Sequence, residues 1–123
     1  MIKFKSLNQS SQFLKILKKK KYNSKYFTIF FDKNINKKKT NVNKYLNISF
    51  VMKKKTGNAV VRNKIKRKLK SAVQKNLDNK RLIDLNYTYV IFGKNNVYKD
   101  KFKLILDEVS KTFKKIKQMD SYT

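Results

Sequence analysis

The sequence contains no cysteine, histidine or proline, and it has only two glycines among its 123 residues. Without cysteine, the chain has no disulfide and no thiolate to act as a nucleophile or metal ligand. The absence of histidine removes the usual general base and the commonest metal ligand. Acidic residues are few and scattered: Asp32, Asp78, Asp84, Asp100, Asp107, Glu108 and Asp120. We therefore expect no catalytic residue and no metal site in this chain.

Long apolar runs are absent as well. Residues 26–31 form one of the longest such segments, far below the ~20 residues of a membrane span. No apolar signal-peptide core follows the first five residues, so we expect a cytoplasmic protein that does not contact a membrane. Because no repeat or Gly/Ser linker divides the chain, we expect one domain over residues 1–118 and a frayed tail over residues 119–123.

Positive charge is the dominant feature of the composition. Thirty-three Lys and Arg against seven Asp and Glu give a formal net charge of +26. Such a molecule repels itself unless a polyanion screens it, and nucleic acid is the obvious polyanion. Codon bias in an AT-rich genome accounts for part of the lysine excess, but it does not explain the scarcity of acidic residues. We therefore expect a nucleic acid partner.

Hydrophobic patterning predicts a mixed α and β domain. Residues 10–21 indicate a short helix that ends in four lysines, and a final helix with a continuous apolar stripe begins with Asp100 as its cap. Aromatic and β-branched segments predict three strands, the first two of which we expect to pair antiparallel. These strands cover residues 26–31, 46–52 and 87–92.

A two-faced helix follows Gly57 in the middle of the chain. Gly57 supplies a tight turn, and Asn58 is a fair N-cap residue. At about 100° per residue, the apolar residues fall in one narrow stripe, while the polar and cationic residues span roughly 140° on the other side. The stripe contains Val61, Ile65, Leu69 and Ala72, and the cationic arc contains Arg62, Asn63, Lys66, Arg67 and Lys70.

The segment over residues 54–67, Lys-Lys-Thr-Gly-Asn-Ala-Val-Val-Arg-Asn-Lys-Ile-Lys-Arg, resembles the signature of the bacterial ribonuclease P protein family. This family is the small basic subunit that works with a catalytic RNA to remove the 5′ leader of precursor tRNA. The resemblance extends over residues 4–117. It implies an α+β fold, a single compact αβββαβα domain whose helices pack on a small mixed sheet. It also implies a left-handed crossover around the basic helix and a further short strand near residues 20–25.

The resemblance also assigns residues to two surfaces. Contacts with the RNA subunit would come from Arg62, Asn63, Lys64, Lys66, Arg67 and Lys70. Lys54 and Lys55, just before the turn, are expected to bind phosphates of the leader or of the RNA subunit. The third motif position, normally Arg, is Lys64 here, so a bidentate phosphate contact becomes a point-charge contact. A leader-binding cleft between the first helix and the sheet would include Phe13, Leu17 and Ile29. By the period of two along a strand, Phe31 lies on the same face as Ile29 and is expected to add a ring to this cleft. Phe13 as an ordinary core residue is the alternative.

In this family the RNA subunit holds Mg²⁺ and hydrolyses the phosphodiester, so the resemblance implies that the chain is the protein cofactor of an endoribonuclease. The expected partners are one ribonuclease P RNA per protein and precursor tRNA, with no metal bound by the chain alone. Two other classes remain open. A ribosomal or other structural RNA-binding protein would share the charge and size, and an amphipathic protein of the membrane surface would share the two-faced helix.

Overall fold

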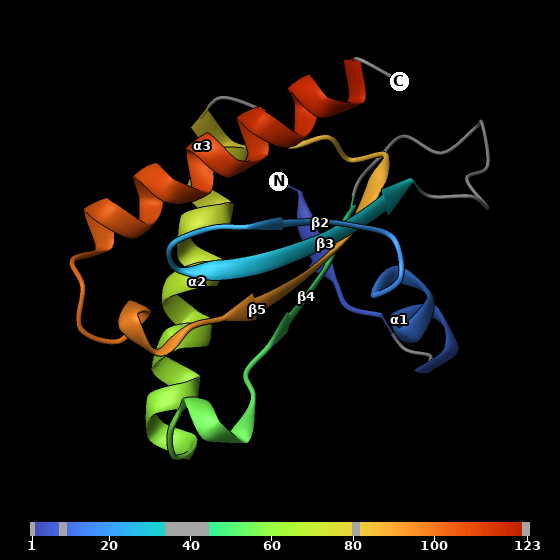
Figure 1. The fold of residues 1–123 in the computed structure, drawn as a ribbon. Coiled ribbons are helices and arrows are strands. Elements are labelled where there is room, and N and C mark those ends of the chain that lie inside the picture. Colours follow the sequence, from blue (N-terminus) through green and yellow to red (C-terminus); the bar gives the residue numbers. More distant parts are fainter. Residues whose placement is uncertain (1, 8–9, 34–44, 80–81, 122–123) are drawn as a thin grey trace.

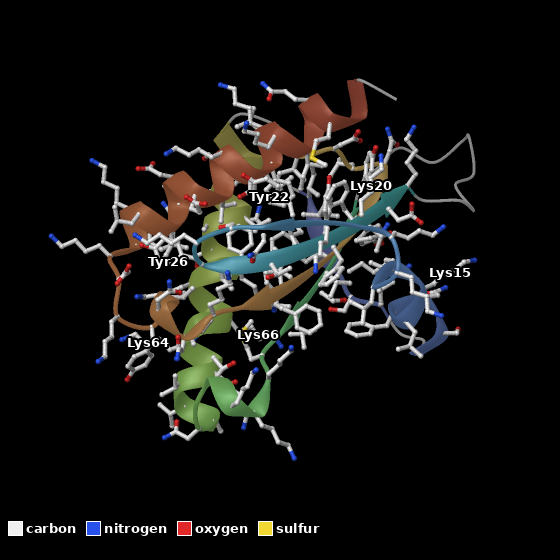
Figure 2. All side chains as sticks on the ribbon, in the orientation of Figure 1. Lys15, Lys20, Tyr22, Tyr26, Lys64 and Lys66 are labelled. Atoms are coloured by element: carbon white, nitrogen blue, oxygen red, sulfur yellow. The ribbon has the colours of Figure 1, made fainter. Side chains whose placement is uncertain are left out.

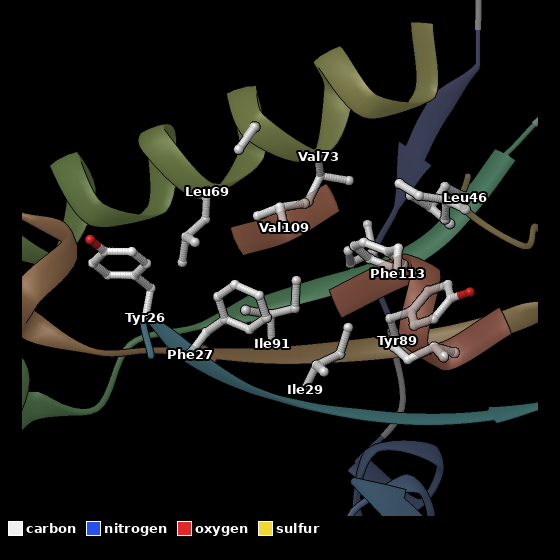
Figure 3. Packing of buried hydrophobic residues seen from close by; sticks show 14 of the residues in the cluster. Tyr26, Phe27, Ile29, Leu46, Leu69, Val73, Tyr89, Ile91, Val109 and Phe113 are labelled. Carbon is white, nitrogen blue, oxygen red and sulfur yellow. The ribbon is translucent and has the colours of Figure 1, made fainter. Parts of the chain in front are cut away.

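The computed structural model describes residues 2–7, 10–33, 45–79 and 82–121. These residues form a five-stranded sheet with α2 and α3 on one face and α1 on the other (Figures 1 and 3). In chain order the elements are β1 (Lys3–Lys5), α1 (Ser10–Ile16), β2 (Lys20–Asn23), β3 (Phe27–Lys33), β4 (Tyr45–Val51), the 3₁₀ turn η1 (Lys54–Thr56), α2 (Ala59–Asn79), β5 (Tyr87–Gly93), the 3₁₀ turn η2 (Asn95–Val97) and α3 (Phe102–Ser121).

The strands lie in the order β1-β4-β5-β3-β2. β5 pairs parallel with β4 and antiparallel with β3, so β5 separates the two strands that were expected to pair directly. That expectation is wrong, because the last strand to enter the sheet takes the central position. α2 connects β4 to the parallel β5, so the basic helix is the crossover connection between these two strands.

Two short strands complete the edges of the sheet. β2 confirms the further strand implied near residues 20–25, and it pairs antiparallel with β3. β1 was not predicted, and it adds a parallel strand beside β4 ahead of the expected αβββαβα order. Three residues, of which only Phe4 is apolar, are too few to show a period of two.

The core lies between the sheet and the pair α2 and α3 (Figure 3). Alternate residues of β3 and β5 point into it, as the period of a strand requires. The predicted stripe of α2 is confirmed, because Ile65, Leu69 and Ala72 are fully buried and Val61 packs beside them. From the strands and α3 the core receives Phe27, Ile29, Phe31, Tyr89, Ile91, Ile105, Val109, Phe113 and Ile116.

Both ends of α3 differ from expectation. Asp100 was expected to cap this helix, but its carboxylate accepts a hydrogen bond from the Tyr26 hydroxyl instead. The helix continues to Ser121, and Met119 packs against the core. The frayed tail expected over residues 119–123 therefore begins inside a helix, while residues 122 and 123 lie outside the described part of the chain.

Candidate nucleic-acid interface

The turn before α2 requires glycine. Gly57 has φ of 154°, and a Cβ added there would lie 2.8 Å from Val61 Cγ1. Asn58 is the N-cap residue, as predicted, because its Oδ1 accepts a 3.0 Å hydrogen bond from the Val61 N–H. These two residues fix where α2 begins and therefore the direction in which its polar side faces.

The predicted cationic arc of α2 forms one continuous surface, which we call the basic ridge: Arg62, Asn63, Lys66, Arg67 and Lys70. Four of its members are exposed, whereas Arg62 is half-buried at the border of the core. The Arg62 Nε is buried, and no group in the described residues accepts a hydrogen bond from it. The ridge therefore presents three exposed cations and one exposed amide to a partner.

Lys64 lies apart from the basic ridge. Figure 2 shows Lys64 and Lys66 on opposite flanks of α2. The Lys64 Nζ lies 4.8 Å from the ring centroid of Tyr98, within the range of a cation–π contact. The structure thus divides the residues that the resemblance assigns to RNA binding between two flanks of one helix.

Lys68, one helical turn after Lys64, is anchored on the same flank. Its ammonium donates to the carbonyls of Val97, Tyr98 and Asp100 at 2.9, 3.1 and 2.8 Å. Burial, followed by the charge of Lys64, lowers the pKa of Lys68 from its ordinary value, while Asp100 acts in the opposite direction. Lys68 therefore serves the fold by holding the segment after η2 against α2.

A second surface lies on the opposite face of the sheet, beside α1. We call it the aromatic surface, and it is built from three half-buried rings: Phe13 of α1, Phe30 of β3 and Phe92 of β5. Phe92 lies 6.2 Å from Phe13 and 5.6 Å from Phe30, the latter edge to face. The Lys53 Nζ lies 5.5 Å from the Phe92 centroid. Rings of this kind beside a cation suit stacked bases and their phosphates.

The expected cleft residues divide between the two faces of the sheet. Phe13 and Leu17 are half-buried on the α1 side. The assignment of Ile29 and Phe31 to the cleft is wrong, because both are buried in the core on the opposite face, with 0% and 2% exposure. Apolar residues occupy both faces of this strand, so the sequence did not show which set points toward α1. Phe30, between them in the strand, lies instead on the α1 face of the sheet, where Ile29 and Phe31 were expected.

Three residues in or beside the aromatic surface were not predicted from the sequence: Phe30, Phe92 and Lys53. Phe30 and Phe92 are aromatic residues at alternate positions to buried ones in their own strands, and that signal was present but ambiguous. Lys53 directly precedes the predicted contacts Lys54 and Lys55, which are exposed in η1. The pairing of β5 with both β3 and β4 brings these distant segments together.

Neither surface has the composition of a metal centre. In the ranges that the structure describes, no three of the residues His, Cys, Asp and Glu gather as metal ligands would. No described helix is long and apolar enough to cross a membrane.

The comparison with known families decides the relationship. The family model described as Ribonuclease P matches residues 1–117. The chain belongs to the ribonuclease P protein family. This membership makes it an RNA-binding component of a ribonucleoprotein that acts in tRNA processing.

Solved structures of the family share the fold. The RNase P protein from Thermotoga maritima aligns with a TM-score of 0.68 and 23% identity, over 90% of this chain and 96% of its own. The RNase P protein from Staphylococcus aureus aligns with a TM-score of 0.66 and 19% identity, over 91% and 94%. Helices packed on a mixed sheet, as predicted, are confirmed. No curated protein matches the sequence at a significant level.

Proposed function

We propose that this chain binds the catalytic RNA of ribonuclease P through α2 and the 5′ leader of precursor tRNA through the aromatic surface. One observation carries the proposal. The basic ridge and the aromatic surface belong to different sides of the molecule, since α2 covers one face of the sheet and α1 the other (Figure 3). Two separate surfaces allow one small protein to hold two RNAs at once.

The basic ridge suits a folded RNA. Lys66, Arg67 and Lys70 are exposed and project from a rigid helix, so their charges neutralise phosphates at fixed spacing. Asn63 adds a donor and an acceptor among these cations. Lys54 and Lys55 extend the positive charge along η1 at the N-terminal end of α2. Phosphate contacts of this kind position a protein on RNA without reading its sequence.

The aromatic surface suits a single-stranded leader. Unpaired bases stack on exposed ring faces with little sequence preference, which fits the varied leaders of different tRNAs. Lys53 beside Phe92 offers a cation to a phosphate of the same strand. Phe13 then has its place in this surface, because its ring meets Phe92 outside the core.

In the proposed division of labour, Mg²⁺ held mainly by the RNA subunit supplies the chemistry of hydrolysis. This chain neutralises charge between the two RNAs and holds the substrate in register. One protein per RNA subunit is sufficient, because a single chain carries both surfaces. Cleavage by the assembled holoenzyme leaves the mature 5′ end of the tRNA.

Reconstitution tests the function. Bacterial ribonuclease P RNA is assayed for removal of a tRNA leader at low Mg²⁺, with and without the purified chain. We expect the chain to restore cleavage at the mature 5′ end, and RNA-free protein alone to be inactive. A ribosomal or other structural RNA-binding protein would bind RNA without restoring cleavage, and that result would reject the proposal.

A further inference from the structure

Tyr98 follows η2 and lies against the flank of α2 that faces away from the basic ridge. Its ring is half-buried, and its centroid lies 4.8 Å from the Lys64 Nζ. Lys64 itself is exposed, so its ammonium remains open to an anion on the side away from the ring. A free lysine side chain has many rotamers, and a ring beneath its ammonium selects a few of them.

The position of Tyr98 is fixed by the backbone around it. The Lys68 ammonium donates to the carbonyls of Val97, Tyr98 and Asp100, which ties three nearby residues to α2. Tyr98 also packs against the core. Because Lys64 and Lys68 are one helical turn apart, this clamp places the Tyr98 ring beside Lys64.

The flank is strongly positive. Lys64 and the half-buried Lys68 are close enough for the charge of Lys64 to contribute to the lowered pKa of Lys68. Lys99 and Lys101, on either side of Asp100, are exposed. Asp100, an acid close enough to act on the pKa of Lys68, has its carboxylate engaged by the Tyr26 hydroxyl. An RNA phosphate at Lys64 would relieve the repulsion between these ammonium groups.

We infer that Tyr98 is a positioning residue for RNA binding: it holds Lys64 ready for a phosphate of the RNA subunit, which contacts both flanks of α2. The inference rests on the proposed function and adds to it a second contact surface. The basic ridge meets the RNA on one flank, while Lys64 meets it on the other. Lys64 retains only a point charge where the family usually has Arg, and the ring supplies the orientation that a planar guanidinium would bring by itself.

A double-mutant cycle tests this coupling with the full chain and bacterial ribonuclease P RNA. The variants are Tyr98→Leu, Lys64→Met and their combination, and the measurement is the dissociation constant over a range of salt concentrations. Tyr98→Leu should weaken binding by roughly two- to five-fold without changing the salt slope, because no charge is lost. Lys64→Met should weaken binding and reduce the salt slope by about one. In the Lys64→Met background, Tyr98→Leu should have no further effect.

Matched variants separate positioning from folding. Tyr98→Phe keeps the ring and should bind like the unmodified chain. The cycle of Tyr98→Leu with Lys66→Met, on the other flank, should be additive. The inference would be overturned if Tyr98→Leu weakened RNA binding as much in the Lys64→Met background as in the unmodified chain. It would also be overturned if Tyr98→Leu alone bound RNA as tightly as the unmodified chain. A third result would overturn the inference by assigning Tyr98 to the fold. In that case Tyr98→Leu would lower the melting temperature, and it would weaken RNA binding equally in the Lys64→Met and Lys66→Met backgrounds.

Failure of the proposed function has a different signature. The unmodified chain would then bind ribonuclease P RNA no more tightly than an unrelated structured RNA of equal length, and the inference would fall with it. If that preference is present and the Tyr98–Lys64 coupling is absent, only the inference fails.

Discussion

The Tyr26 hydroxyl donates a 2.6 Å hydrogen bond to Asp100 Oδ2, joining the start of β3 to the segment that leads into α3. This bond to the carboxylate, followed by burial, raises the pKa of Tyr26 to about 12. Tyr26→Phe removes the bond and leaves a partly buried carboxylate without this donor. We expect the free energy of unfolding at pH 7 to fall by about 1–3 kcal/mol, measured by urea denaturation.

The same bond predicts a pH dependence. Because the pKa of Tyr26 is higher in the folded chain than its ordinary value of 10.0, its contribution is complete below pH 10 and is lost as the pH rises toward 12. The stability difference between the unmodified chain and Tyr26→Phe should therefore shrink over that interval. A difference that stays constant from pH 9 to pH 12 would show that the hydrogen bond does not control this titration.

Lys68→Met should destabilise the fold although it removes a charge from a strongly cationic chain. The substitution leaves the carbonyls of Val97, Tyr98 and Asp100, at and after the end of η2, without their shared donor. We expect a loss of about 2 kcal/mol or more in the free energy of unfolding. Lys75→Met, at an exposed position of the same helix, is the matched control and should leave stability nearly unchanged. Equal stability of the two variants would show that the Lys68 ammonium does not hold this segment.

Removing two exposed charges of the basic ridge should weaken binding to the RNA subunit without affecting folding. The variant Lys66→Ala with Arg67→Ala should reduce the salt slope of binding by about two, because each phosphate contact releases roughly one counterion. The double substitution Lys111→Ala with Lys114→Ala removes two exposed charges from α3 and should change the slope much less. If both double variants reduced the salt slope of RNA binding equally, the overall charge of the chain, rather than the basic ridge, would govern binding.

Arg62 is the exception within the ridge. It is half-buried and its Nε is enclosed, so Arg62→Ala should lower the melting temperature as well as RNA affinity. Arg67→Ala, at an exposed position, is the comparison and should lower affinity alone. Thermal denaturation of the two variants is the measurement. A lower melting temperature for Arg62→Ala alone would show that the aliphatic part of Arg62 packs against the fold, in addition to the role of its charge in RNA binding.

Neighbouring residues of β3 should have opposite roles. Phe30→Ala should reduce the affinity of the holoenzyme for precursor tRNA by about 1–3 kcal/mol, because the ring offers a stacking surface, while affinity for mature tRNA is kept. Ile29→Ala should instead cost about 2–5 kcal/mol of folding stability, because its side chain is fully buried. Dissociation constants for both tRNAs and a urea titration check the contrast.

The opposite result is equally clear. A selective loss of leader affinity in Ile29→Ala, with Phe30→Ala affecting only stability, would restore the original assignment of the cleft. Phe13→Ala should behave like Phe30→Ala, since the two rings meet the same Phe92.

The sequence predicted α2 better than the sheet, and the reason is physical. A helix shows its buried and exposed sides in local spacing, so the burial of Ile65 and Leu69 and the exposure of Lys66 could be read directly. β3 has apolar residues on both faces, so choosing between Ile29 and Phe30 required knowing which helix covers which face. The central place of β5 depends on contacts between distant segments, and spacing along the chain does not encode it.

The most direct test of the two-surface account compares precursor and mature tRNA. The affinity of ribonuclease P RNA for each is measured with and without the chain, under conditions where the RNA is folded in both. We predict that the chain tightens binding of precursor tRNA with a leader of several nucleotides and leaves mature tRNA nearly unchanged. Phe30→Ala should reduce this difference by about 1–3 kcal/mol. Equal tightening of both tRNAs by the unmodified chain would contradict the account.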